Sequence, residues 1–152
     1  MTNEEQKNAM TDSDLVDLAT QVIEAVNRRE LEFLMDTLAP DYVGEWPDAT
    51  LARDASIERE IVMMTGIPDT RFDIDAVTML ADGRVLVEAT VVGTHTGTLV
   101  LPFGVTLPPT GRSLSMPFDF IMTFADGLLT HERLRFDHHV LIQQLSDPGD
   151  AS

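Results

Sequence analysis

The sequence contains no cysteine in its 152 residues, and only 10 lysines and arginines stand against 26 aspartates and glutamates. Without cysteine the chain has no disulfide, no thiolate nucleophile and no thiolate metal site. Its net charge of −16 disfavours nucleic acids and anionic membranes as partners, because both require clustered basic side chains. We interpret the acidity as a source of solubility.

Long apolar runs are also absent. No stretch of the sequence approaches the roughly 18 apolar residues of a membrane-spanning helix. The segment Met-Thr-Asn-Glu-Glu-Gln at the start lacks the basic and apolar regions of a signal peptide. We therefore expect a cytoplasmic protein with no membrane and no nucleic-acid partner.

Several motifs that carry chemistry are missing as well. The chain has no glycine-rich phosphate loop, no Gly-x-Ser-x-Gly elbow and no zinc-ligand helix motif. These absences disfavour phosphoryl transfer and serine-type hydrolysis. His131, His138 and His139 could suggest a metal, but neighbouring side chains diverge and no second ligand cluster accompanies them. We expect neither a metal site nor a cofactor.

The apolar spacing divides the chain into helices first and strands afterwards. A period of three to four residues predicts helices at 14–28, 30–38 and 54–65. Alternation and valine-rich or threonine-rich runs predict strands at 71–76, 84–94, 113–124 and 128–137. We expect one domain over 12–146, with disordered tails at 1–11 and 147–152.

Two Asp-Gly pairs join strand-like runs, at Asp82-Gly83 and Asp126-Gly127. Such a pair between two strands is the strongest short signal for a β-hairpin. Helices followed by antiparallel strands predict an α+β fold, with the helices packed on one face of a curved sheet. This geometry encloses a pocket between the sheet and the helices.

Short motifs spread over residues 13–146 resemble the SnoaL-like polyketide cyclases, which have the cone-shaped nuclear-transport-factor-2-like fold. Their order and spacing carry the resemblance. The motifs are Ala39-Pro40-Asp41, Pro68-Asp69, Gly93-Thr94-His95-Thr96-Gly97, Pro108-Pro109-Thr110-Gly111, Asp126-Gly127, Phe136-Asp137 and Gln144-Leu145. The resemblance implies a curved mixed or antiparallel sheet, three N-terminal helices, a deep apolar pocket, frequent dimers and cofactor-free aldol-type ring closure.

The resemblance also implies where the acid–base residues should lie. In the family an aspartate in the last strand shuttles the proton, and a histidine precedes it by two residues. When Phe136-Asp137 is aligned with the family pattern, Leu134 stands at the aspartate position and Glu132 at the histidine position. Glu88 falls where an arginine is common, and the loop between Gly97 and Pro108 is longer than usual.

Glu132 is the leading candidate for a general base. It alternates along its strand with basic residues and shares a face with Leu134 and Phe136. An apolar wall raises the pKa of a carboxyl towards the value needed to remove a proton next to a carbonyl. The alternative is a carboxylate that pairs with an arginine and serves only the structure.

Glu88 and His95 are the other candidates for catalysis. If Glu88 and Glu132 both pointed inward, one of them would hold a proton, because neighbouring carboxylates resist double ionisation. Glu88 could instead pair with Arg133 or Arg135. His95 could hydrogen-bond a substrate carbonyl, or it could simply stabilise a turn.

The predicted ligand-binding residues are large and apolar. Trp46 could stack on an aromatic substrate, although a single tryptophan also serves as packing. Methionines could adapt to the ligand, and part of the aromatic face of the strand 113–124 could reach the pocket. The set is Trp46, Met64, Phe120, Met122, Leu134 and Phe136.

Two main hypotheses follow. The first is a cofactor-free enzyme on a small apolar carbonyl compound, with Glu132 as the base and His95 or Glu88 polarising the developing enolate. The second is a non-catalytic domain that binds a small hydrophobic ligand or a protein, as the leucine at position 134 suggests. Hydration or isomerisation is a third option. We expect a homodimer formed through the outer face of the sheet.

Overall fold

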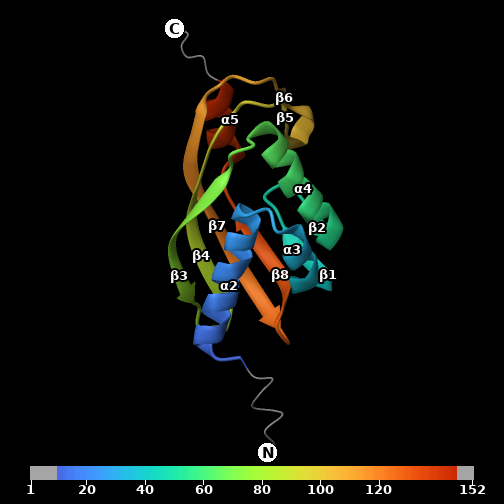
Figure 1. Cartoon of the computed structure of the whole chain (residues 1–152), viewed down its shortest axis with the longest axis vertical. Coiled ribbons are helices and arrows are strands. Elements are labelled where there is room, and N and C mark those ends of the chain that lie inside the picture. Colours follow the sequence, from blue (N-terminus) through green and yellow to red (C-terminus); the bar gives the residue numbers. More distant parts are fainter. Residues whose placement is uncertain (1–9, 147–152) are drawn as a thin grey trace, which may run out of the picture.

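The computed structural model describes residues 10–146, so the expected tails lie outside the described residues except for Met10 and Thr11. Three helices precede most of the sheet and a fourth follows it (Figure 1). The helices are α2 (Asp12–Asn27), α3 (Leu31–Thr37), α4 (Arg53–Gly66) and α5 (His138–Ser146), with a 3₁₀ turn η1 (Pro102–Gly104). The strands are β1 (Leu38–Glu45), β2 (Thr50–Ala52), β3 (Arg71–Met79), β4 (Val85–Thr94), β5 (Leu99–Val100), β6 (Thr106–Leu107), β7 (Ser113–Ala125) and β8 (Leu128–Arg135).

Six strands form one curved sheet in the order β2-β1-β8-β7-β4-β3. Neighbours in this sheet are antiparallel except β1 and β8, which run parallel and make the sheet mixed. The strands β5 and β6 form a separate small hairpin within the loop between Gly97 and Pro108. The α+β class, the curved sheet and the three N-terminal helices are confirmed.

The helices α2, α3 and α4 cover one face of the sheet, as Figure 1 shows. The helix α2 packs on β3 and β4, and α4 packs on β1. Alternating residues of β7 turn buried side chains to this inner face, among them Phe118 and Phe120. On the opposite face, the intervening residues of β4 and β8 are exposed or half-buried.

Both predicted hairpins form. Gly83 has a φ of 90°, and Asp126 and Gly127 have φ values of 53° and 80°. Two successive positive φ values define the turn that fits the right-handed twist of the flanking strands. The hairpin β7–β8 places Glu132 opposite Met122 and Leu134 opposite Phe120.

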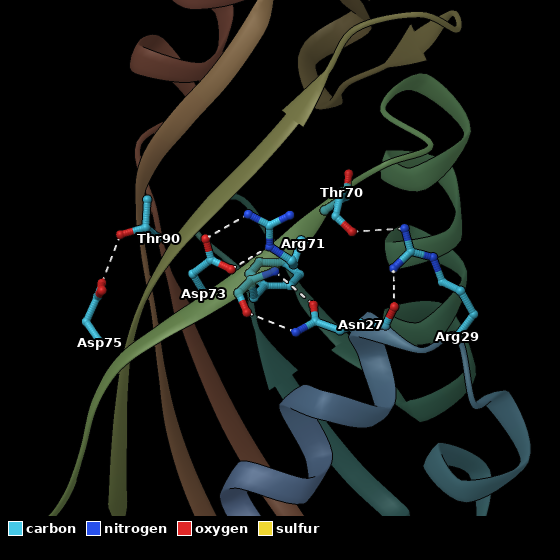
Figure 2. A network of polar contacts seen from close by, with 8 residues as sticks. Asn27, Arg29, Thr70, Arg71, Asp73, Asp75 and Thr90 are labelled. Carbon is cyan, nitrogen blue, oxygen red and sulfur yellow. Dashed lines mark hydrogen bonds and ion pairs between the residues drawn. The ribbon is translucent and has the colours of Figure 1, made fainter.

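The end of α2 is tied to the start of β3 by polar contacts (Figure 2). The Asn27 amide nitrogen donates to the Phe72 carbonyl at 2.9 Å, and the Phe72 N–H donates to the Asn27 side-chain oxygen at 2.8 Å. The Arg29 guanidinium donates to the carbonyl oxygens of Pro68 and Thr70, each at 2.9 Å. These bonds fix the position of Arg29 beside the helices that enclose the pocket.

Several elements differ from the sequence-based expectations, and the short strands β2, β5 and β6 were not predicted. The strand β1, predicted in part as the end of a helix, contains Pro40 and shows no clean alternation. Its register with β8 shifts between Leu38 and Val43, where a proline without an N–H is tolerated. The helix α5 was not predicted, and α2 begins at Asp12, two residues before the predicted start, because Thr11 caps it in a reciprocal pair with Asp14.

Candidate functional site

A small hollow of about 30 Å³ lies between the sheet and the helices α2 and α4. Most of its walls are aliphatic, with Phe120 contributed by β7. Its polar side chains come from four elements or connections: Tyr42 of β1, Ser56 and Glu60 of α4, Glu132 of β8, and Trp46 after β1. We call this hollow the inner pocket. Its polar groups converge although they are distant in the sequence.

Glu132 is the buried carboxyl that the sequence predicted. Its residue is 7% exposed, and its Oε1 accepts a hydrogen bond of 2.7 Å from the Tyr42 hydroxyl. Burial raises the pKa of Glu132 to about 7, while the Tyr42 bond acts in the opposite direction. The carboxyl is therefore poised to exchange a proton near neutral pH.

A chain of hydrogen bonds leads to Glu132. The Trp46 indole Nε1 donates to the Ser56 Oγ at 3.0 Å. The Ser56 hydroxyl in turn interacts with Tyr42, where it lowers the pKa that burial and Glu132 otherwise raise. Because an indole N–H can only donate, the Ser56 proton is directed to Tyr42, and the Tyr42 proton is directed to Glu132. All three donors thus point towards the carboxylate.

Gly44 makes room for this chain. Gly44 lies beside Glu132 in the parallel β1–β8 register. A Cβ at this position would lie 2.5 Å from the Ser56 Oγ and 2.8 Å from the Tyr42 hydroxyl oxygen. The polar chain therefore passes directly over the backbone of β1, which only a residue without a side chain permits.

Glu60 supplies a second carboxyl to the inner pocket. Glu60 is half-buried by its solvent exposure. Desolvation and, to a smaller extent, the Glu132 charge raise its pKa to about 8, although the Arg29 charge acts in the opposite direction. Two neighbouring carboxyls with raised pKa values share protons near neutrality, because their double ionisation is costly. The sequence offered such a pair for Glu132 as one of two alternatives, with Glu88 as the partner.

Glu60 also borders a larger hollow of about 200 Å³ at the surface, which we call the outer groove. The groove lies between α4 and the α2–α3 region, and its other lining residues are apolar except Arg29. Leu31 and Ile61 border it, although each is 48% exposed. Exposed apolar side chains around a hollow are typical of a ligand site.

A third hollow, of about 320 Å³, lies on the other side of Trp46. It is lined by α4, the β5–η1 segment, Phe136 and α5. Trp46 is the lining residue that this cavity shares with the inner pocket. The indole is held by the Ser56 bond, by Arg59 at 5.2 Å from its ring centroid and by an edge contact with Phe136. It therefore separates the two spaces.

The structure does not place Glu88 in the pocket. Glu88 is exposed on the outer face of the sheet. The positions of β4 that point inward are the alternating ones that include Val85 and Val87. The cross-strand neighbour of Glu88 on β7 is Asp119, which pairs with Arg135 at 3.2 Å. Arg133 pairs with Glu45, so neither arginine is the expected partner of Glu88.

His95 is fully buried and far from Glu132 along the sheet. In the sheet register Val85 of β4 lies level with Glu132, with one strand between them. His95 lies ten residues beyond Val85, which corresponds to about 30 Å from Val85 at the usual rise of a strand. Its ring nitrogens contact the Thr110 hydroxyl at 2.9 Å and the Leu107 carbonyl at 3.2 Å. The turn-stabilising alternative describes His95 better than the catalytic one.

The predicted binding residues separate into four groups. Trp46 and Phe120 line the inner pocket, and Phe136 and Trp46 line the 320 Å³ cavity. Met64 lines the outer groove. Met122 and Leu134 face inward but are packed in the core, with exposures of 0% and 2%.

Tyr42, Ser56 and Glu60 were not predicted. Tyr42 is the only tyrosine of the chain, and a buried phenol usually finds a hydrogen-bond partner. This signal could have singled it out, but β1 has no clear strand pattern. Glu60 lies among charged residues of an amphipathic helix, and nothing in that pattern distinguishes it from a solvated side chain.

Among residues 10–146, no three histidine, aspartate or glutamate side chains are grouped so that they could hold a metal ion. Within the same range, no helix has the length and apolar character needed to cross a membrane.

The fold and the pocket define a class: small α+β domains with a curved sheet, covering helices and acid–base groups between them. The model of the SnoaL-like domain matches residues 19–132, and the chain belongs to this family. No curated protein matches the sequence significantly. The predicted family resemblance is thus confirmed.

Solved structures of the same fold carry several activities in their names. IdmH, a candidate polyketide cyclase from Streptomyces antibioticus, has 25% identity and a TM-score of 0.70, over 84% of this chain and 95% of that one. A candidate SnoaL-like polyketide cyclase from Jannaschia sp. CCS1 has 19% identity and a TM-score of 0.74, over 92% and 99%. AclR, a candidate hydroxylase from Streptomyces galilaeus, has 22% identity and a TM-score of 0.74, over 88% and 81%.

Proposed function

We propose that this SnoaL-like domain is a cofactor-free acid–base enzyme that closes a ring in a small apolar carbonyl compound by an aldol-type reaction. One observation carries the proposal: Glu132 is a buried carboxyl that receives a hydrogen bond from Tyr42 at the inner end of an apolar pocket. The likeness to IdmH, a candidate polyketide cyclase, supports the substrate class.

Glu132 is the base in this proposal. Tyr42 binds its Oε1, so its Oε2 takes the proton from the carbon next to the substrate carbonyl. A base whose pKa is about 7 is ionised in about half of the molecules at neutral pH, and it binds a proton strongly enough to remove one from carbon. The electron pair of the broken C–H bond forms the enolate, whose carbon then attacks a second carbonyl group.

The position of Glu132 accounts for the leucine at 134. Both residues face the inner side of β8, two positions apart, opposite Met122 and Phe120. The family resemblance puts the aspartate at Leu134, which is packed in the core here. In our proposal the acid–base group has moved along the same face of the strand. A homodimer through the outer sheet face stays a prediction.

The test is deuterium exchange at the α-carbon of 1-tetralone, a flat apolar ketone, followed by NMR in D₂O. We expect the protein to accelerate exchange over buffer and Glu132→Gln to lose on the order of 10²-fold or more. Glu88→Gln is the matched control, with the same chemical change on the outer face. An unchanged rate in Glu132→Gln would remove Glu132 as the base.

A second function, ligand binding without catalysis, is favoured by the size of the inner pocket. A space of about 30 Å³ corresponds to about one water molecule, so a substrate must displace side chains to reach Glu132. If 1-tetralone binds, as shown by NMR shift changes, and wild type does not accelerate exchange, the binding function replaces the enzymatic one.

A further inference from the structure

Glu60 lies where the inner pocket and the outer groove meet. Both spaces are lined by Glu60 together with Val26, Leu34 and Ile57. The cavity of about 320 Å³, by contrast, shares only Trp46 with the inner pocket. A ligand in the groove therefore lies against the Glu60 carboxyl, and these shared side chains, rather than the indole, stand between it and Glu132.

The charges around Glu60 determine which carboxyl keeps a proton. Glu132 of β8 and Arg29 at the end of α2 are the charged groups that act on it. The Arg29 guanidinium donates to four carbonyl oxygens, those of Val26, Asn27, Pro68 and Thr70, at 2.9 to 3.1 Å. Arg29 is thus held by the backbone, and Glu132, with its Tyr42 donor, is the carboxyl better suited to carry the charge.

We propose that Glu60 is the general acid that works with Glu132: its carboxyl group donates its proton to the carbonyl oxygen of a ketone that occupies the outer groove. This inference rests on the proposed function and adds the group that the sequence sought in Glu88 or His95. Glu60 contacts the substrate directly, since it lines the groove as well as the pocket.

The proton transfers balance in each step. Glu132 takes the proton from the α-carbon, the C–H electron pair becomes the C=C bond, and the Glu60 proton passes to the carbonyl oxygen. Glu132 is then protonated and Glu60 is a carboxylate. In ring closure Glu60 takes back the enol proton, the enol carbon bonds to the second carbonyl carbon, and Glu132 protonates the oxygen that forms. Both carboxyls return to their first state.

The groove and its charges also define the substrate class. Its apolar lining, which includes Leu31, Ile61 and Met64, suits an apolar body. Two neighbouring carboxyls and a net charge of −16 repel anions. The substrate is therefore a neutral ketone or diketone whose carbonyl end points towards Glu60, rather than a carboxylic acid or a phosphate.

The experiment compares Glu60→Gln and Glu60→Leu with wild type in the 1-tetralone exchange assay across pH. Glu58→Gln is the matched control, since Glu58 lies on the same helix but borders the 320 Å³ cavity. We expect a bell-shaped pH profile for wild type, and a rate lower on the order of 10²-fold in Glu60→Leu, as for loss of a general acid. Both Glu60 variants should lose the alkaline decline, and Glu58→Gln should keep it.

A second measurement does not depend on turnover. The carbonyl ¹³C signal of bound 1-tetralone should move downfield in wild type and in Glu132→Gln, and this shift should be lost in Glu60→Leu. If Glu132→Gln stops exchange while both Glu60 variants keep the wild-type profile and shift, Glu60 is not the acid and the proposed function stands. If wild type does not accelerate exchange, the enzymatic function and this role of Glu60 both fail.

Discussion

At the scale of single residues, the inner pocket depends on the direction of its hydrogen bonds. The indole of Trp46 can only donate, so Ser56 and Tyr42 present their protons towards Glu132. The Glu132 carboxylate therefore receives a hydrogen bond that stabilises its negative charge in apolar surroundings. Such groups in one pocket are typical of acid–base sites.

Gly44→Ala tests the packing of this chain without removing a polar group. The new Cβ would lie 2.5 Å from the Ser56 Oγ and 2.8 Å from the Tyr42 hydroxyl oxygen. We expect the free energy of unfolding in urea to fall by about 1–3 kcal/mol, as for overpacking. The pKa of Glu132, followed by ¹³C NMR, should rise because displacement of Tyr42 weakens the bond that lowers it.

The double variant Gly44→Ala with Ser56→Ala is the control, because it removes the oxygen nearest to the new Cβ. It should recover part of the lost stability, giving a favourable coupling energy between the two sites. Equal stability of Gly44→Ala and wild type would show that the chain does not pack on this glycine.

At the scale of elements, strand ends and connections decide which side chains meet. The long strand β4 separates His95 from the pocket region, and the segment from Leu107 to Arg112 packs around His95. The His95 N–H donates to Arg112, and its carbonyl accepts from Thr110 and Gly111. His95 thus serves the connection between β6 and β7.

His95→Ala should therefore affect this connection rather than catalysis. Loss of a buried ring and of two ring contacts should lower the free energy of unfolding by about 2–4 kcal/mol. Amide hydrogen exchange at residues 107–112 should rise, while the pH profile of 1-tetralone exchange keeps its shape. A folded variant whose exchange activity is abolished would instead support the catalytic role.

The predictability of elements follows the strength of their local patterns. The helices covering the sheet and the two hairpins were recognisable because amphipathic spacing and Asp-Gly turns are local. The strand β1 was missed since Pro40 and a register shift interrupt it, and its parallel pairing with β8 joins residues far apart in the chain. Because β1 was not predicted, Tyr42 was not recognised as a residue of the site.

At the scale of the whole molecule, the buried carboxyls affect stability. Glu132 and Glu60 have raised pKa values of about 7 and 8, so between about pH 4.5 and 8 these two groups bind more protons in the folded protein than in the unfolded chain. Their contribution to stability is full below about pH 4.5, and it is lost as the pH rises through the folded pKa values. Carboxylates with lowered pKa values, which are Glu45, Asp69, Asp73 and Asp82, act in the opposite direction.

We expect Glu132→Gln to change this pH dependence. A shift from 4.5 to about 7 corresponds to about 3 kcal/mol. As the pH rises from 4.5 to 8, the free energy of unfolding of Glu132→Gln should therefore increase by about this amount relative to that of wild type. Urea unfolding in 0.5 M salt, which screens the overall charge of −16, measures it.

Glu88→Gln is the control for this measurement, because its carboxyl is exposed on the outer face. Its stability should follow that of wild type across the same pH range. If the curves for Glu132→Gln and wild type stay parallel, the Glu132 carboxyl has an ordinary pKa in the folded protein and is not poised for proton exchange.

The sequence by itself determined the α+β class, the family and the inward direction of Glu132, because each depends on local periodicity or on motifs in a fixed order. It named Glu88 and missed Glu60, since the direction of a side chain on a strand or on the charged side of a helix is decided only when the layers pack. The tertiary structure brought Tyr42, Ser56 and Glu60 to Glu132 from separate elements. Convergence of this kind is a property of strand order and helix packing, and no segment of the chain encodes it alone.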